Sequence, residues 1–258
     1  MSSDHAGDPL DPEIERVAEA VVRAGRRLGA RGLIAAGEGN ISVRLPRERL
    51  LVTPSGLRKD ELTPSDLLTV HIGRDGAGDS GRSSGPATRE LRPTSDLAIH
   101  RAIMAARRDV VAIAHAHLPA AMAFTLAGES PDPAALPETA LLLPRLPVVP
   151  FGAPGSEDLA RRIAEALAEP PEPLPGAAIL ERHGALALGG VARSAERVAG
   201  HEDRMSDPAG EAWVEEAIKA VGQAFDRLEL IEVLCRATRD SLLLRAARRR
   251  AEVGRGRV

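Results

Sequence analysis

The chain has 258 residues, of which 43% are hydrophobic, and this length allows one large domain with its own core. The formal net charge of −3 excludes a protein that binds nucleic acid through overall positive charge. A single cysteine excludes an internal disulfide framework, and no apolar run is long enough to predict a membrane span, so we predict a cytoplasmic protein without nucleic-acid or membrane partners.

Residues 1–11 are polar and acidic, lack the features of a signal peptide, and are predicted to be disordered. Asp11 is a suitable N-cap and Pro12 fits the first position of a helix, so the first helix is expected to begin there. Periodicity and turn signals then predict, in order, helix 12–28, strands 41–45, 50–53 and 67–72, helix 94–107, strand 110–115, helix 119–126, strand 146–149, helix 156–168, strands 177–180 and 185–188, and mostly helix over 192–244 with a break at 206–210. From residue 94 onward, helices and strands alternate, which is typical of an α/β protein.

Two histidines, His115 and His117, end the apolar strand 110–115. Side chains two residues apart on a strand share a face, so both imidazoles project together from the strand end. This arrangement favours a metal site, and two packed structural histidines are the alternative. His183 lies in a turn between two later strands, and a histidine in such a turn is usually an ordinary surface residue. It becomes a candidate ligand because a metal site built on His115 and His117 still lacks a third ligand.

Three neutral imidazoles leave one position of Zn²⁺ open, which is a catalytic rather than a structural arrangement. An ion with an open position can polarise a carbonyl and stabilise an enediolate. We therefore predict that His115, His117 and His183 hold Zn²⁺, or another divalent metal, and that the ion acts on a small phosphorylated sugar or hydroxy-ketone.

Polar turns flank the first predicted hairpin, at residues 37–42 and 53–56. Such turns present backbone N–H groups and hydroxyls to an anion, and Thr94 and Ser95 add a helix N-terminus. Together these segments predict a phosphate pocket, with ordinary turn chemistry as the alternative. Asp96 either favours the start of its helix or places a carboxylate beside the metal, as a ligand or as a base. His100 follows Asp96 by four residues and is expected to point into structure or solvent rather than to share the metal.

Taken in chain order, these motifs resemble the class II aldolase/adducin family, which includes L-fuculose-phosphate aldolase and L-ribulose-5-phosphate 4-epimerase. The resemblance covers residues 12–190 and 220–244. It rests on five motifs: Gly39-Asn40-Ile41-Ser42, Thr53-Pro54-Ser55-Gly56, Arg92-Pro93-Thr94-Ser95-Asp96, His115-Ala116-His117 and Arg182-His183-Gly184.

The resemblance implies a three-layer α/β/α sandwich around a mostly antiparallel central sheet, assembled as a homotetramer with active sites between subunits. It implies that His115, His117 and His183 are the zinc ligands and that Asp96 is the acidic residue of the site. It also implies that the substrate phosphate is bound by Asn40, Ser55, Gly56, Thr94 and Ser95.

The chain departs from the family pattern in two places. It has no tyrosine, although the aldolases place one from a neighbouring subunit near the metal, and Glu138 stands at that position. Residues 191–219 are predicted to be an insertion without a counterpart in the family, within a single domain spanning 12–244. A basic tail, 245–258, follows and is interpreted as a solvated helix end.

The function that these features indicate is a metal-dependent lyase that cleaves a phosphorylated ketose by a retro-aldol reaction through a zinc-stabilised enediolate. Asp96 and Glu138 are the candidate catalytic residues. A sugar-phosphate 4-epimerase, or a decarboxylase or dehydratase of the same family, uses the same chemistry and remains an alternative. A non-catalytic adducin-like binding module is a third possibility, against which the retention of all three histidines argues.

Overall fold

The computed structural model describes residues 11–73, 91–190 and 211–255. The predictions of a disordered N-terminus and of a helix break at 206–210 fall wholly or mostly outside these residues. Within them, the structure confirms the predicted fold class.

The described residues contain one seven-stranded sheet with the strand order β3-β2-β1-β4-β7-β6-β5. The strands are β1 (Asn40–Leu45), β2 (Arg49–Val52), β3 (Leu68–His71), β4 (Ala112–Ala116), β5 (Val148–Val149), β6 (Ala177–Leu180) and β7 (Gly184–Gly189). Every neighbouring pair is antiparallel except β5 and β6, which are parallel. The two strands that carry most of the candidate site, β4 and β7, lie side by side in the middle of this sheet.

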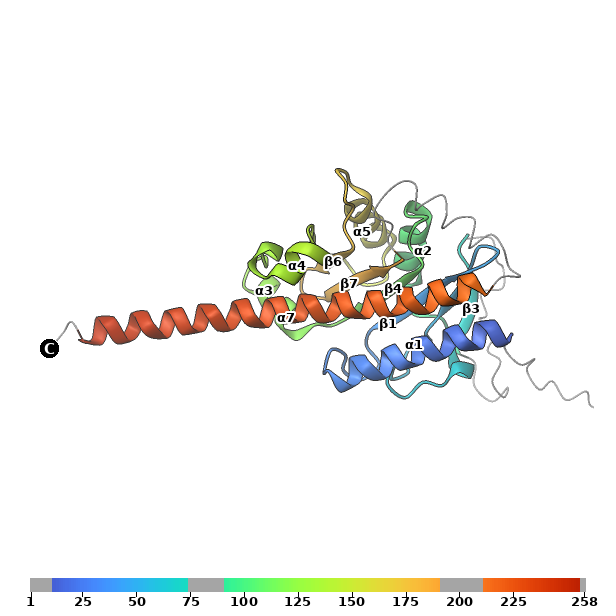
Figure 1. The fold of residues 1–258 in the computed structure, drawn as a ribbon, viewed down its shortest axis with the longest axis horizontal. Coiled ribbons are helices and arrows are strands. Elements are labelled where there is room, and N and C mark those ends of the chain that lie inside the picture. The colour runs from blue at the N-terminus through green and yellow to red at the C-terminus, as the bar shows by residue number, and fades with distance from the viewer. Residues whose placement is uncertain (1–10, 74–90, 191–210, 256–258) are drawn as a thin grey trace, which may run out of the picture.

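Helices cover both faces of the sheet and make the three layers (Figure 1). They are α1 (Pro12–Ala30), α2 (Leu97–Ala106), α3 (Pro119–Leu126), α4 (Pro137–Leu142), α5 (Glu157–Ala168) and α7 (Ala212–Arg255), with short 3₁₀ turns at Pro64–Asp66 and Pro133–Ala135. α1, α3 and α7 pack with one set of buried strand residues, whereas α2 and α5 pack with the other set.

Alternation along β1 decides which side chains reach the site. Ile41 and Val43 enter the core beneath α1 and α7. Successive strand residues point to opposite faces, so Asn40, Ser42 and Arg44 point toward α2 instead. Arg44, for example, donates to the Met104 carbonyl oxygen of α2 at 2.6 Å. The face under α2 is therefore the polar face of this strand, and it is the face on which the candidate site lies.

Local signals explain where two of the helices begin. Asp11 caps α1 as predicted, because its side chain accepts a hydrogen bond from the Glu13 N–H at 3.1 Å. α2 begins later than predicted, at Leu97, because Thr94 and Ser95 lie in the turn that precedes it and Asp96 is its N-cap. The sequence patterns did not predict α4, a single short helix in a proline-rich stretch.

The long helix α7 has an inner half and an outer half. The inner half packs on the sheet, with Trp213, Phe225 and Cys235 buried, as expected for Cys235. From Arg236 to Glu252 the side chains are exposed or half-buried, and this outer half projects beyond the body of the protein (Figure 1). No helix in the described ranges has both the length and the apolar character that crossing a membrane requires.

Candidate metal centre and substrate site

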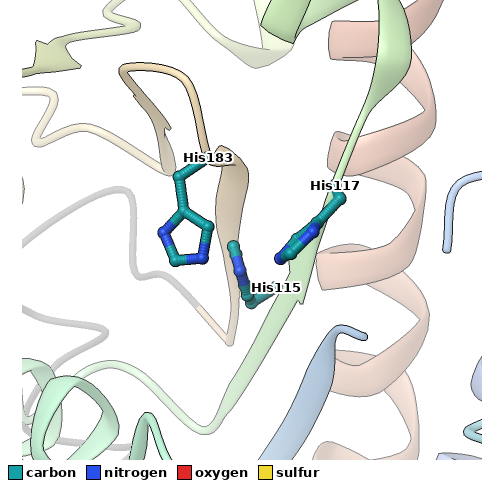
Figure 2. A group of neighbouring side chains, drawn as sticks. All are labelled: His115, His117 and His183. Carbon is teal, nitrogen blue, oxygen red and sulfur yellow. The ribbon is translucent and has the colours of Figure 1, made fainter. Parts of the chain in front are cut away.

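The three candidate histidines meet at the ends of β4 and β7. The ring centroids of His115 and His117 are 5.0 Å apart, those of His115 and His183 4.8 Å, and those of His117 and His183 4.9 Å. One nitrogen from each ring lies within 4.8 Å of the other two. Figure 2 shows the three rings gathered around one point, so the chain alone assembles the whole cluster.

Two glycines let the backbone come close enough to form this cluster. Gly184 has a φ of +118°, and a Cβ atom there would collide with the Ala116 carbonyl oxygen. Gly39 has a φ of +70°, and its Cβ would lie 2.8 Å from the His115 carbonyl oxygen. Because only glycine tolerates both the conformation and the contact, these positions explain why His183 can turn back toward the end of β4.

His115 shows that the cluster fits a metal ion. Its side chain is 2% exposed, and its Nδ1 donates to the Ala185 carbonyl oxygen at 2.9 Å. Its Nε2 is buried and has no hydrogen-bond partner among the described residues. A buried nitrogen with a free lone pair is costly unless something binds it. Two further imidazoles surround this nitrogen, so the chemistry of the donor set suits a divalent cation.

Burial also keeps two of the three histidines in the form that binds metal. Burial, and after it the neighbouring His183, lower the pKa of His115 to about 3. The pKa of His183 is likewise lowered by burial and by His117. Both imidazoles are therefore neutral near pH 7, and a neutral imidazole is the ligand form.

Glu38 orients the third histidine, and the sequence analysis did not single it out. Its Oε2 lies 3.2 Å from Nδ1 of His117. A carboxylate that accepts from one imidazole nitrogen fixes the ring and leaves the other nitrogen for a metal. Its position in the turn before Asn40 was the available signal, because Asn40 pairs with His115 across β1 and β4.

Backbone bonds hold two of the predicted phosphate-binding turns together. The Ser55 N–H donates to the Arg92 carbonyl oxygen at 2.8 Å, and the Thr94 N–H donates to the Thr53 carbonyl oxygen at 3.2 Å. Ser55, Gly56 and Ser95 are exposed, whereas Thr94 is buried. Three of the five predicted phosphate contacts thus lie at the surface of one tied pair of turns.

Lys59 joins the third turn to this pair. Its Nζ donates to the Gly37 carbonyl oxygen at 2.8 Å and to the Leu57 carbonyl oxygen at 2.6 Å. Burial lowers the pKa of Lys59 to about 8. The three polar turns that the sequence singled out therefore converge on one region beside the histidines.

Asp96 turns its carboxylate away from the helix that it begins. It makes no capping bond to α2, and its Oδ2 instead accepts from Nδ2 of Asn40 at 2.8 Å. Its charge acts on both His115 and His183, which places it beside the cluster. Glu138 is different, because it is exposed in the first turn of α4 and no described contact joins it to the histidines.

Comparison with known proteins identifies the family. Residues 19–204 match the class II aldolase and adducin N-terminal domain, which is more than half of the chain. The chain belongs to this family. A similar solved structure is the L-fuculose-1-phosphate aldolase from Thermus thermophilus, with 26% identity and a TM-score of 0.65, over 90% of this chain and 97% of that chain.

Curated relatives of the family carry different activities. A methylthioribulose-1-phosphate dehydratase from Granulibacter bethesdensis is 36% identical over 44% of this chain and 48% of that protein. A 3-oxo-tetronate 4-phosphate decarboxylase from Cupriavidus necator is 30% identical over 60% of this chain and 67% of that protein. The match thus spans about half of the dehydratase, and membership of the family does not by itself name the reaction.

Proposed function

We propose that this protein is a zinc-dependent lyase that cleaves a phosphorylated ketose by a retro-aldol reaction. The observation that carries the proposal is the buried Nε2 of His115, which has no partner among the described residues and faces two further imidazoles. The resemblance in fold to a solved aldolase supports cleavage of a carbon–carbon bond. The activities of that aldolase, the dehydratase and the decarboxylase are named for phosphorylated compounds, which supports the substrate class.

In this proposal His115, His117 and His183 hold the ion. When bound, the ion supplies Lewis-acid chemistry, since it polarises a carbonyl and stabilises negative charge that develops on oxygen. Asp96, held beside the histidines by Asn40, accepts the proton of the substrate hydroxyl next to the broken bond. The electrostatic influence of Asp96 on His115 and His183 supports this role.

The converging turns are proposed to hold the substrate phosphate. The hydroxyls of Ser55, Thr94 and Ser95 and the backbone at Gly56 supply donors. Asn40 can add one more, because an amide nitrogen carries two N–H groups and Asp96 takes one of them. Thr94 and Ser95 also precede α2, whose N-terminus favours an anion.

Assembly completes the site in this proposal. No described contact joins Glu138 to the histidines of its own chain. The family resemblance places the equivalent residue at a neighbour's metal, so Glu138 is proposed as the acid that acts across a subunit contact. Exposed Leu141 and the exposed run Leu242–Leu244 offer apolar surface for such contacts. We propose a homotetramer. Sedimentation that shows an active monomer would contradict it.

A dehydratase is the second candidate, because the curated relative with 36% identity has that activity. A decarboxylase and a 4-epimerase would rely on the same stabilisation of an enolate or enediolate by the bound metal. An adducin-like scaffold is disfavoured, because a scaffold needs neither the histidine cluster nor the orienting contact from Glu38. A cytoplasmic location remains a prediction from the single cysteine, which is buried.

The test is a screen of sugar phosphates with the full-length, zinc-loaded protein. An aldolase releases an aldehyde and a three-carbon ketone phosphate, a dehydratase releases water without breaking the carbon chain, and a decarboxylase releases carbon dioxide. We expect aldehyde release. Turnover of no sugar phosphate by the assembled, metal-loaded protein would contradict an enzymatic function.

A further inference from the structure

His100 is a buried histidine that the proposed chemistry does not yet use. It lies on α2, four residues after Asp96, and is fully buried against β1. Its Nε2 is 2.6 Å from Oδ1 of Asn40, and its Nδ1 is 2.6 Å from Oγ of Ser42. Both ring nitrogens are therefore engaged, and His100 has none left with which to bind a metal ion.

The chemistry of the partners fixes the direction of each bond. Asn40 donates from Nδ2 to the Asp96 carboxylate, so its oxygen faces His100. An amide oxygen only accepts, and therefore Nε2 of His100 carries the proton. Burial lowers the pKa of His100 to about 4, so the ring is neutral near pH 7 and its Nδ1 accepts from the Ser42 hydroxyl. One continuous chain of donors runs from Ser42 through His100 and Asn40 to Asp96.

We propose that His100 is a positioning residue that sets the direction of the Asn40 amide and thereby holds the Asp96 carboxylate beside the metal centre. If the amide were turned over, its oxygen would face the carboxylate and its N–H groups would face the Nε2–H of His100. Both contacts would then be repulsive. With His100 in place, only the orientation that donates to Asp96 satisfies every group.

The register of the sheet explains why this chain of bonds matters at the site. Asn40 is the cross-strand partner of His115, so the residue that His100 orients borders a predicted metal ligand. Asn40 and Ser42 share a face of β1, and His100 shares a face of α2 with Asp96. The four side chains thus form one buried unit between a strand and a helix, with the ionised end at the histidine cluster.

Two substitutions distinguish a positioning role of His100 from a packing role. In His100→Gln, the amide nitrogen can occupy the place of Nε2 and still donate to Asn40. In His100→Asn, the shorter side chain can occupy only the place of Nδ1, so the bond to Asn40 is lost. Ile103→Val is the packing control, because it trims the same face of α2 without touching the chain of bonds.

The first measurement needs no substrate. Exchange of the Asn40 side-chain N–H with solvent, followed by NMR in the full-length protein, reports the bond to Asp96. We expect slow exchange in the wild type, in His100→Gln and in Ile103→Val, and fast exchange in His100→Asn. Slow exchange in His100→Asn, or an Nδ1–H tautomer of His100 in the wild type, would overturn the proposal.

The second measurement rests on the proposed function, because it needs the substrate that the screen identifies. A misplaced catalytic group costs up to about 10²-fold in rate, so kcat of His100→Asn should fall toward that factor while metal content stays near that of the wild type. His100→Gln should recover most of kcat. Equal losses of kcat in both variants, in proportion to their loss of thermal stability, would show a packing role and overturn the proposal. If the wild type turns over nothing, the proposed function fails and the exchange measurement still decides the role of His100.

Discussion

The metal centre and the outer half of α7 differ in what completes them. His115 is buried, and the strands that carry the cluster lie in the middle of the sheet, so one chain supplies all three imidazoles. The outer half of α7 projects from the body with Leu242, Leu243 and Leu244 between 53% and 64% exposed. Nothing in the described part of the same chain covers these leucines. Folding of one chain completes the first region, whereas we propose that another subunit covers the second.

The same contrast divides the site itself. His115 and Asp96 are anchored by buried hydrogen bonds to β7 and β1. Ser55 and Glu138 are exposed, and no described contact joins Glu138 to the cluster of its own chain. We therefore expect metal binding to be a property of each chain and turnover to be a property of the assembly.

Glu138→Gln tests the expectation that turnover depends on the assembly, and it has the largest expected effect. The substitution keeps the shape of the side chain and removes its proton. Loss of a general acid costs about 10²–10⁴-fold, so turnover should fall by that factor while metal content and substrate affinity stay nearly unchanged. Glu129→Gln, at an exposed position after α3, is the control. Unchanged turnover in Glu138→Gln would make this residue an ordinary surface glutamate.

Glu38→Ala tests the expectation that metal binding is a property of each chain. The carboxylate fixes the ring of His117, and loss of such a partner costs about 10–100-fold in metal affinity. Competition with a chelator for Zn²⁺ measures the effect. Glu38→Gln should lose less, because its amide oxygen still accepts from Nδ1 but carries no charge. Wild-type affinity in the alanine variant would mean that His117 is oriented by something else.

Ser55→Ala tests the phosphate-binding turns. One hydrogen bond to a charged group is worth about 1.5–3 kcal/mol, so binding of the phosphorylated substrate should weaken by about ten- to a hundredfold. Calorimetry with the substrate and with inorganic phosphate measures the loss, and metal content should not change. If both ligands bind as well as they do to the wild type, the phosphate lies elsewhere.

The buried histidines predict how the metal-free protein responds to acid. The pKa values of His100 and His115 are about 4 and about 3 in the folded protein, below the ordinary value of 6.5. As the pH falls below 6.5, the unfolded chain takes up protons first, so the free energy of unfolding decreases. The contribution of His100 ends near pH 4 and that of His115 near pH 3, and neither changes with pH above about 7.5. Each histidine contributes at most about 1.4 kcal/mol per pH unit. Urea unfolding at pH 7.5 and pH 5 measures the slope, which His100→Gln should reduce. An equal slope in that variant would contradict the assignment to His100.

Much of the fold was predictable because the signals were local. Asp11 and Pro12 indicated the start of α1, and the apolar runs of β4, β6 and β7 indicated buried strands. The pair His115 and His117 was predictable for the same reason, since the period of a strand puts both side chains on one face. α4 was missed because a short helix in a proline-rich stretch has too few residues to show a period.

The parts of the site that the sequence did not reveal depend on contacts between distant segments. These contacts form only after the sheet has folded. They join Glu38 to His117, Lys59 to Gly37, and Ser42 to His100. The spacing of Asp96 and His100 showed that they share a helix face, but not that Asn40 from β1 lies between their polar groups. For Glu138 the missing information is the neighbouring subunit, which one chain does not contain.

Metal stoichiometry tests the central claim most directly. Elemental analysis of the protein after mild purification, or after addition of Zn²⁺, should find one ion per chain. His115→Ala and His183→Ala should lose it, because loss of a ligand costs more than the roughly 10–100-fold that follows loss of an orienting partner. His71→Ala, at an exposed position on β3, should keep it. The absence of any transition metal in the wild type, with no uptake when Zn²⁺ is added, would contradict the account.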